Sequence, residues 1–123
     1  MAYVVVWMDT DEAKFFSFTP GKITKDNVKI GASESKQAHD KDHHKIPLHF
    51  FQEITNKLKA ATEVLVVGPG VSKTHFMHHI EKSGPSDLKK KIIGIENMDQ
   101  LTDNQIVAHA RKVFKVHGLF ESI

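Results

Sequence analysis

Short apolar runs separated by polar turns recur along the chain, and the most regular of them is Val64 to Val67. Four consecutive apolar residues predict a strand that is covered on both faces, as in the centre of an α/β sheet. The run ends at Gly68-Pro69-Gly70, and a helical pattern starts at Ser72. This stretch therefore predicts a buried strand, a glycine-rich turn and a helix.

The first thirty residues predict three strands. Residues 2–9 form a β-branched and aromatic run. Residues 13–19 place Phe16 and Phe18 on one face and Phe15 on the other. Residues 22–30 are mostly polar, as expected of an edge strand. Because the turns between these strands are short, the three strands should form an antiparallel meander.

Helices and strands alternate after residue 46. Helices are expected at residues 47–61, at 72–82 and from Thr102 onward, where Gln105 completes a capping box. A fifth strand is expected at residues 92–96, after a short basic turn at 87–91. The predicted buried stripes are Phe51, Ile54, Leu58 and Ala61 in the first helix, Phe76, Met77 and Ile80 in the second, and Ile106, Val107, Ala110, Val113 and Phe114 in the third.

The element order is βββαβαβα, which predicts one α/β domain over residues 1–123. Right-handed crossovers place strand 4 beside strand 1, so the expected sheet order is 3-2-1-4-5 with strand 2 antiparallel. This is a ribonuclease-H-like mixed sheet with helices on both faces. Val66 and Ile93 are expected to be core positions in central strands.

One edge of that sheet is the predicted place for a site. Strands 1, 3, 4 and 5 run in the same direction, so their carboxyl ends bring together Asp9, the polar segment 31–46, the turn 68–74 and residues 96–103. Ligands of open α/β sheets bind at such an edge.

Charge and composition exclude some classes of function and indicate a cellular location. The chain has 17 basic and 15 acidic residues and a net charge of +2, and Arg111 is its one arginine. Recognition of a DNA sequence is therefore not expected. Nine histidines should raise the net charge as the pH falls below about 6.5. With no cysteine, and with neither a signal peptide nor a membrane span at the N-terminus, the expected location is the cytoplasm.

Metal chemistry finds little support in the sequence. Asp9 and Glu53 could contribute to a two-metal nuclease site, but the end of strand 4 carries glycines where a further carboxylate is needed. The histidines and aspartates of residues 39–49 match no zinc spacing. His75 and His79 have helical i, i+4 spacing without the glutamate of a zinc protease, because Phe76 occupies its place. No catalytic metal and no cofactor are predicted.

The sequence GPGVSKT resembles a phosphate loop but departs from it, because Ser72 stands where glycine must precede the lysine. The simpler interpretation is a turn in which Gly68 and Gly70 fit the backbone and Ser72 or Thr74 caps the helix. The functional alternative is a weak anion site made of helix N–H groups and Lys73.

The runs EVLVVGPGVSKTHFMHHIEKSGP and KIIGIENMDQLTDNQIVAHARKVF resemble bacterial relatives of the archaeal–eukaryotic release-factor central domain. The resemblance covers residues 47–115, and residues 2–30 by strand order. It implies the same βββαβαβα arrangement and a role with the ribosome or tRNA. Those release factors carry a catalytic Gly-Gly-Gln between strand 3 and the first helix. The segment here, GASESKQAHDKDHHK, lacks it, and Gln37 is its one glutamine.

Two functions from different classes remain open. The first is a binding module of the translation machinery that acts in ribosome rescue or regulation, and the second is a peptidyl-tRNA hydrolase with a substitute catalytic loop. Whether the chain is an enzyme is left undecided. The candidate binding residues are Asp9, Lys36, Gln37, Lys41, His43, His44, Gly68, Gly70, Ser72, Lys73 and Thr74.

Overall fold

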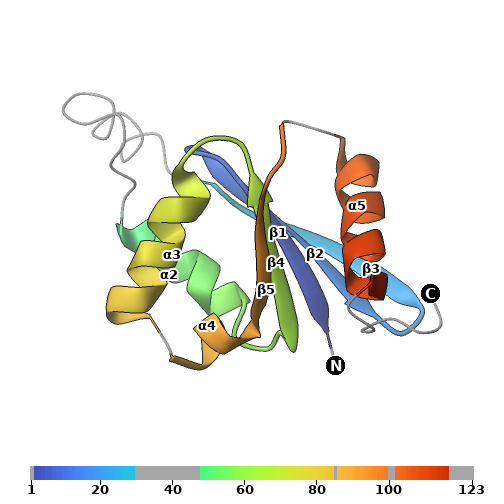
Figure 1. The fold of residues 1–123 in the computed structure, drawn as a ribbon, viewed down its shortest axis with the longest axis horizontal. Helices are drawn as coiled ribbons and strands as arrows, with labels where there is room; N and C mark the ends of the chain where they lie inside the picture. The colour runs from blue at the N-terminus through green and yellow to red at the C-terminus, as the bar shows by residue number, and fades with distance from the viewer. Residues whose placement is uncertain (1, 30–47, 85, 100–101, 117–123) are drawn as a thin grey trace.

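A five-stranded mixed sheet forms the middle layer of the molecule in a computed structural model (Figure 1). The structure describes residues 2–29, 48–84, 86–99 and 102–116. The strands are β1 (Tyr3–Met8), β2 (Glu12–Thr19), β3 (Lys22–Lys29), β4 (Glu63–Gly68) and β5 (Ile92–Asn97). The helices are α2 (Leu48–Lys57), α3 (Ser72–Ser83), α4 (Ser86–Lys91) and α5 (Asp103–Val116).

The strand order is β3-β2-β1-β4-β5, as the element order predicted. β2 is antiparallel to both β1 and β3, whereas β1, β4 and β5 are parallel. β1 and β4 therefore occupy the centre of the sheet. The predicted ribonuclease-H-like topology is confirmed, and the carboxyl ends of β1, β3, β4 and β5, which run in the same direction, lie at one edge.

Helices cover both faces of the sheet, with α2 and α3 on one side and α5 on the other (Figure 1). The strands alternate between the two faces, so Phe15, Val64 and Val66 belong to the α2–α3 core. Phe16, Phe18 and Leu65 belong to the α5 core. The prediction that residues 64–67 are covered on both faces is therefore confirmed, as all four are fully buried.

The helical stripes predicted from the sequence form most of the rest of the two cores. Phe51, Ile54, Leu58 and Ala61 are buried, although α2 ends at Lys57 rather than at residue 61. Of the other expected positions, Met77, Val107 and Val113 are only partly buried, and the remainder are buried: Phe76, Ile80, Ile106, Ala110 and Phe114.

Two local expectations are wrong. Residues 87–91 were expected to form a turn, but they belong to the short helix α4, which buries Leu88. Ile93 was expected to be a core position in a central strand, but β5 is an edge strand and Ile93 is only partly buried against the α5 core. Ile92 lies opposite Val64, and a register shift then places Gly94 opposite Leu65 and Ile95 opposite Val66, where Ile95 remains 44% exposed.

The helices in the described part of the chain are all too short or too polar to cross a lipid bilayer.

Candidate functional site

The carboxyl ends of β1 and β4 meet closely at the predicted edge of the sheet. A Cβ atom on Gly68 would lie 2.1 Å from the Met8 carbonyl oxygen, so this position accepts only glycine. Gly68 also accepts a hydrogen bond of 3.1 Å from the Met98 backbone N–H, which ties the end of β4 to the segment after β5. Three chain segments predicted to share this edge therefore do so.

Asp9 follows β1 at this edge and organises the turn into β2. Its Oδ1 accepts hydrogen bonds from the backbone N–H groups of Asp11 at 2.8 Å and Glu12 at 2.9 Å. The Asp9 N–H in turn donates to the Glu12 carbonyl at 3.0 Å. The side chain is therefore bound to its own turn, which is the geometry of an aspartate that closes a β-hairpin.

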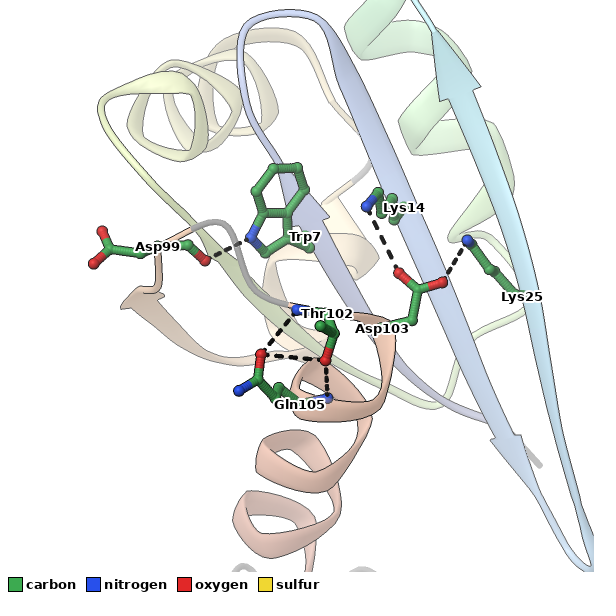
Figure 2. Close-up of polar contacts among 7 residues, drawn as sticks. All are labelled: Trp7, Lys14, Lys25, Asp99, Thr102, Asp103 and Gln105. Atoms are coloured by element: carbon green, nitrogen blue, oxygen red, sulfur yellow. Dashed lines mark hydrogen bonds and ion pairs between the residues drawn. The ribbon is translucent and has the colours of Figure 1, made fainter.

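The N-terminus of α5 is capped by side chains close to it in the sequence (Figure 2). The Thr102 hydroxyl accepts a hydrogen bond from the Gln105 N–H at 3.2 Å, and the Thr102 N–H donates to Gln105 Oε1 at 2.9 Å. The predicted capping box is thus confirmed. Nearby, the Trp7 indole donates to the Asp99 carbonyl at 3.4 Å, which ties the segment before α5 to β1.

Asp103, the first residue of α5, connects that helix to two strands. Its carboxylate lies 2.5 Å from the Lys25 ammonium on β3 and 3.6 Å from the Lys14 ammonium on β2, as Figure 2 shows. The hydrogen bond from Lys25, with a smaller contribution from Lys14, lowers the pKa of Asp103 below its ordinary value. Sequence analysis missed this cluster because its members lie far apart in the chain.

The N-terminus of α3 differs from that of α5. Val71 occupies the N-cap, and no side chain of the described residues caps the first turn. The expectation that Ser72 or Thr74 caps this helix is therefore wrong. Ser72 is 1% exposed, and its hydroxyl has no hydrogen-bond partner in the described structure.

Lys73 is also buried, with 4% of its surface exposed. Its ammonium donates a hydrogen bond of 2.7 Å to the Gly70 carbonyl, so the side chain folds back over the turn. Burial lowers the pKa of Lys73 below its ordinary value. Gly70 itself has a φ of +65°, which explains glycine at this position, and no atom lies within 4 Å of where its Cβ would be.

The candidate residues divide into those that the structure brings together and those that it does not describe. Gly68, Gly70, Ser72, Lys73 and Thr74 form one continuous turn and helix start at the predicted edge. Lys36, Gln37, Lys41, His43 and His44 lie outside the described residues.

The other candidates for metal chemistry have protein partners. Glu53 lies 2.5 Å from His49 on the same helix, and the ring of His79 stacks at 5.4 Å on Phe51. Within the described ranges, no three histidine, aspartate or glutamate side chains gather where they could hold a metal ion. A further pair that sequence analysis missed is Glu96 with His109, at 2.6 Å between β5 and α5.

Fold and edge together define a ribonuclease-H-like α/β protein whose exposed turns lie at the carboxyl ends of its parallel strands. The chain is similar to the crystal structure of the Thermoplasma acidophilum Pelota protein, with a TM-score of 0.66 and 22% identity over 99% of this chain and 35% of that one. It is also similar to Archaeoglobus fulgidus Pelota, with a TM-score of 0.67 and 16% identity over 95% of this chain and 33% of that one.

A third similar structure is the archaeal translation termination factor aRF1, with a TM-score of 0.55 and 14% identity over 94% of this chain and 40% of that one. The chain thus spans about a third of the length of the Pelota structures. It matches no family model and no curated protein sequence. At these identities the likeness establishes the fold.

Proposed function

We propose that this chain is a binding module of the translation machinery that contacts the ribosome or tRNA. The observation that carries the proposal is the fold shared with aRF1, described as an archaeal translation termination factor. The sequence resemblance of residues 47–115 to the release-factor central domain supports the same assignment. Because the chain lacks Gly-Gly-Gln between β3 and α2, we propose binding in ribosome rescue or regulation rather than termination itself.

The segment 31–46 is the element that we propose for this contact. It follows β3, whose last residue Lys29 pairs with Glu12 beside the Asp9 turn, so it leaves the sheet at the candidate edge. Its sequence contains Lys36, Lys41 and Lys45, which can contact phosphate groups. It also lies between strand 3 and the first helix, where the release factors carry their tripeptide.

Three carboxylates on the described rim of the same edge oppose the binding of phosphate. Asp9, Asp11 and Asp99 lie there, and the last two are exposed. These carboxylates repel phosphate, so we expect the lysines of residues 31–46 to provide most of the attraction to RNA. Only a few phosphate contacts are then available, so binding should weaken steeply with salt without being lost altogether.

Co-sedimentation with ribosomal particles tests the proposal. Replacement of residues 33–44 with a short Gly-Ser linker should preserve the fold, since the free energy of loop closure changes slowly with length. The shortened protein should show an unchanged melting temperature and no longer sediment with ribosomes. Normal sedimentation of a folded shortened protein would refute the role of this segment.

A charge-matched control separates specific contact from bulk charge. Lys36, Lys41 and Lys45 are replaced by alanine in one variant. In the other variant Lys59, Lys89 and Lys90, which lie toward the opposite edge of the sheet, are replaced. Both variants lose three positive charges, and only the first should lose sedimentation. Equal losses would show that net charge alone drives the association.

The alternative function, hydrolysis of peptidyl-tRNA, is tested on the same ribosomal particles. Release of peptide from peptidyl-tRNA, abolished by Gln37→Ala without loss of sedimentation, would establish a hydrolase instead of a binding module.

A further inference from the structure

The first turn of α3 leaves polar groups without partners at a surface turn. The first N–H groups of any α-helix have no acceptor within the helix, and here no described side chain caps them. The helix has 12 residues, so its aligned peptide dipoles add up to a partial positive charge at its N-terminus. Gly70, Val71 and Thr74 around it are exposed, which gives a ligand access to these N–H groups.

The Ser72 hydroxyl is the second observation, independent of the helix terminus. Side chains in a helix tilt toward its N-terminus, so the hydroxyl of the first residue lies at that end. It is buried and has no partner among the described residues. A buried hydroxyl without a hydrogen bond is unfavourable, which indicates that a group missing from the protein chain completes the site.

Lys73 places a positive charge at the same end. Its ammonium reaches back to the Gly70 carbonyl at 2.7 Å, the one hydrogen bond that the described structure gives it. No carboxylate of the described residues lies within ion-pair distance. An ammonium has three donors, and its flexible stem lets it swing from the carbonyl to an arriving anion.

We propose that the turn Gly70–Thr74 binds a phosphate group through the first-turn N–H groups of α3, the Ser72 hydroxyl and the Lys73 ammonium. A phosphate carries several acceptor oxygens, so it can satisfy these donors together. The group is either a free or terminal phosphate or a phosphodiester of an RNA backbone. The site differs from a Walker loop, because Ser72 occupies the place of the glycine before the lysine. The inference does not require the proposed ribosome contact.

NMR of the amide groups tests the proposal with inorganic phosphate as the probe, at constant ionic strength set by chloride. The amides of residues 70–74 should shift and saturate, and the melting temperature should rise with phosphate concentration. Ser72→Ala should weaken phosphate binding about tenfold, the loss of one charge-assisted hydrogen bond. Lys73→Met should remove the saturating shifts.

Lys82→Met is the matched control, since it removes the same charge from the exposed last turn of α3. It should bind phosphate as the unaltered protein does. Lys73→Met and Ser72→Ala should fold at least as stably as the unaltered protein in phosphate-free buffer, because each removes an incompletely paired buried group. Two results together would overturn the proposal: a lower stability of Lys73→Met and no response of the unaltered protein to phosphate. They would show that Lys73 only stabilises the turn.

A second arm identifies the source of the phosphate. A short single-stranded RNA without terminal phosphate is titrated in parallel. Shifts of residues 70–74 with inorganic phosphate indicate a free or terminal phosphate, and shifts with the RNA alone indicate a phosphodiester. Absence of both overturns the site. The variant shortened at residues 33–44 should respond as the unaltered protein does, so the failure of either proposal leaves the other standing.

Discussion

Gly68 and Gly70 lie two residues apart in one turn and both have a positive φ, +151° and +65°, but only Gly68 also lacks space for a side chain. At Gly68 the backbone of β1 leaves no space, because the Met8 carbonyl occupies the position of a Cβ. At Gly70 the space is open and only the positive φ favours glycine. A sequence shows two glycines in a turn but cannot distinguish close approach from backbone conformation.

Alanine substitutions should separate the cost of the positive φ, present at both positions, from the cost of the close contact, present only at Gly68. Gly70→Ala should cost about 1 to 2 kcal/mol of unfolding free energy, the strain of a left-handed conformation. Gly68→Ala should cost more than about 3 kcal/mol, because a backbone atom must move to relieve the overlap. Urea unfolding measures both values. Similar losses in the two variants would contradict the close contact between Gly68 and Met8.

Val66 and Ile93 should differ in their tolerance of a charge. Val66→Asp places an unpaired carboxylate in a fully buried position of a central strand and should cost several kcal/mol, enough to unfold a marginal domain. Ile93→Asp should cost less, since Ile93 is partly buried on an edge strand and the carboxylate can reach water. Melting temperatures measure both, and an unchanged value for Val66→Asp would contradict its burial.

At the scale of elements, β3 is an edge strand that pairs with β2 along its length and is joined to two helices by ion pairs. Only Val28 of its residues is buried. Asp26 forms an ion pair of 2.5 Å with Lys57 of α2, and Lys25 forms one of 2.5 Å with Asp103 of α5. Because α2 and α5 cover opposite faces of the sheet, the two pairs hold β3 from both sides. Each pair is exposed, so each should contribute less than about 1 kcal/mol.

The stability of β3 should therefore depend on pH and salt more than that of β1 or β4. The hydrogen bond from Lys57 lowers the pKa of Asp26, and that from Lys25 lowers the pKa of Asp103. A carboxyl whose folded-state pKa is lowered contributes stability above its unfolded pKa and loses it as the pH falls through the folded value. Protection of β3 amides from hydrogen exchange should thus fall below about pH 4 and in high salt. Equal changes in β3 and β4 would contradict this local anchoring.

At the scale of the whole molecule, the sheet order followed from the sequence because short turns and right-handed crossovers allow few alternatives. The helix α4 was missed because Leu88 is its only buried apolar residue, which gives no periodicity. Ile93 was misplaced because β5 is the last strand of the sheet, so its residues have neighbours on one side only and are less covered than those of β4. The candidate edge was predictable from strand direction, whereas the fold of Lys73 back onto Gly70 depends on the path of one turn.

The two cores share β1 and β4, so the protein should unfold in one cooperative step. Trp7, the one tryptophan, is buried in the α5 core and reports on that face by fluorescence. Circular dichroism at 222 nm reports on helices of both faces. The two urea transitions should coincide. A fluorescence midpoint that differs from the dichroism midpoint would show that the α5 layer separates from the rest.

The register shift in β5 also affects whether the edges of two molecules can pair in concentrated solution. The outer edge of a strand offers a regular row of N–H and C=O groups that a strand of another molecule can complete. Within its bounds β5 has neither lysine nor proline to prevent this, whereas β3 carries Lys22, Lys25 and Lys29. A bulge bends a strand and interrupts the regular row, which makes it a poor template for polymerisation. The irregularity beside Ile93 thus protects the less charged side of the sheet from growth into fibres.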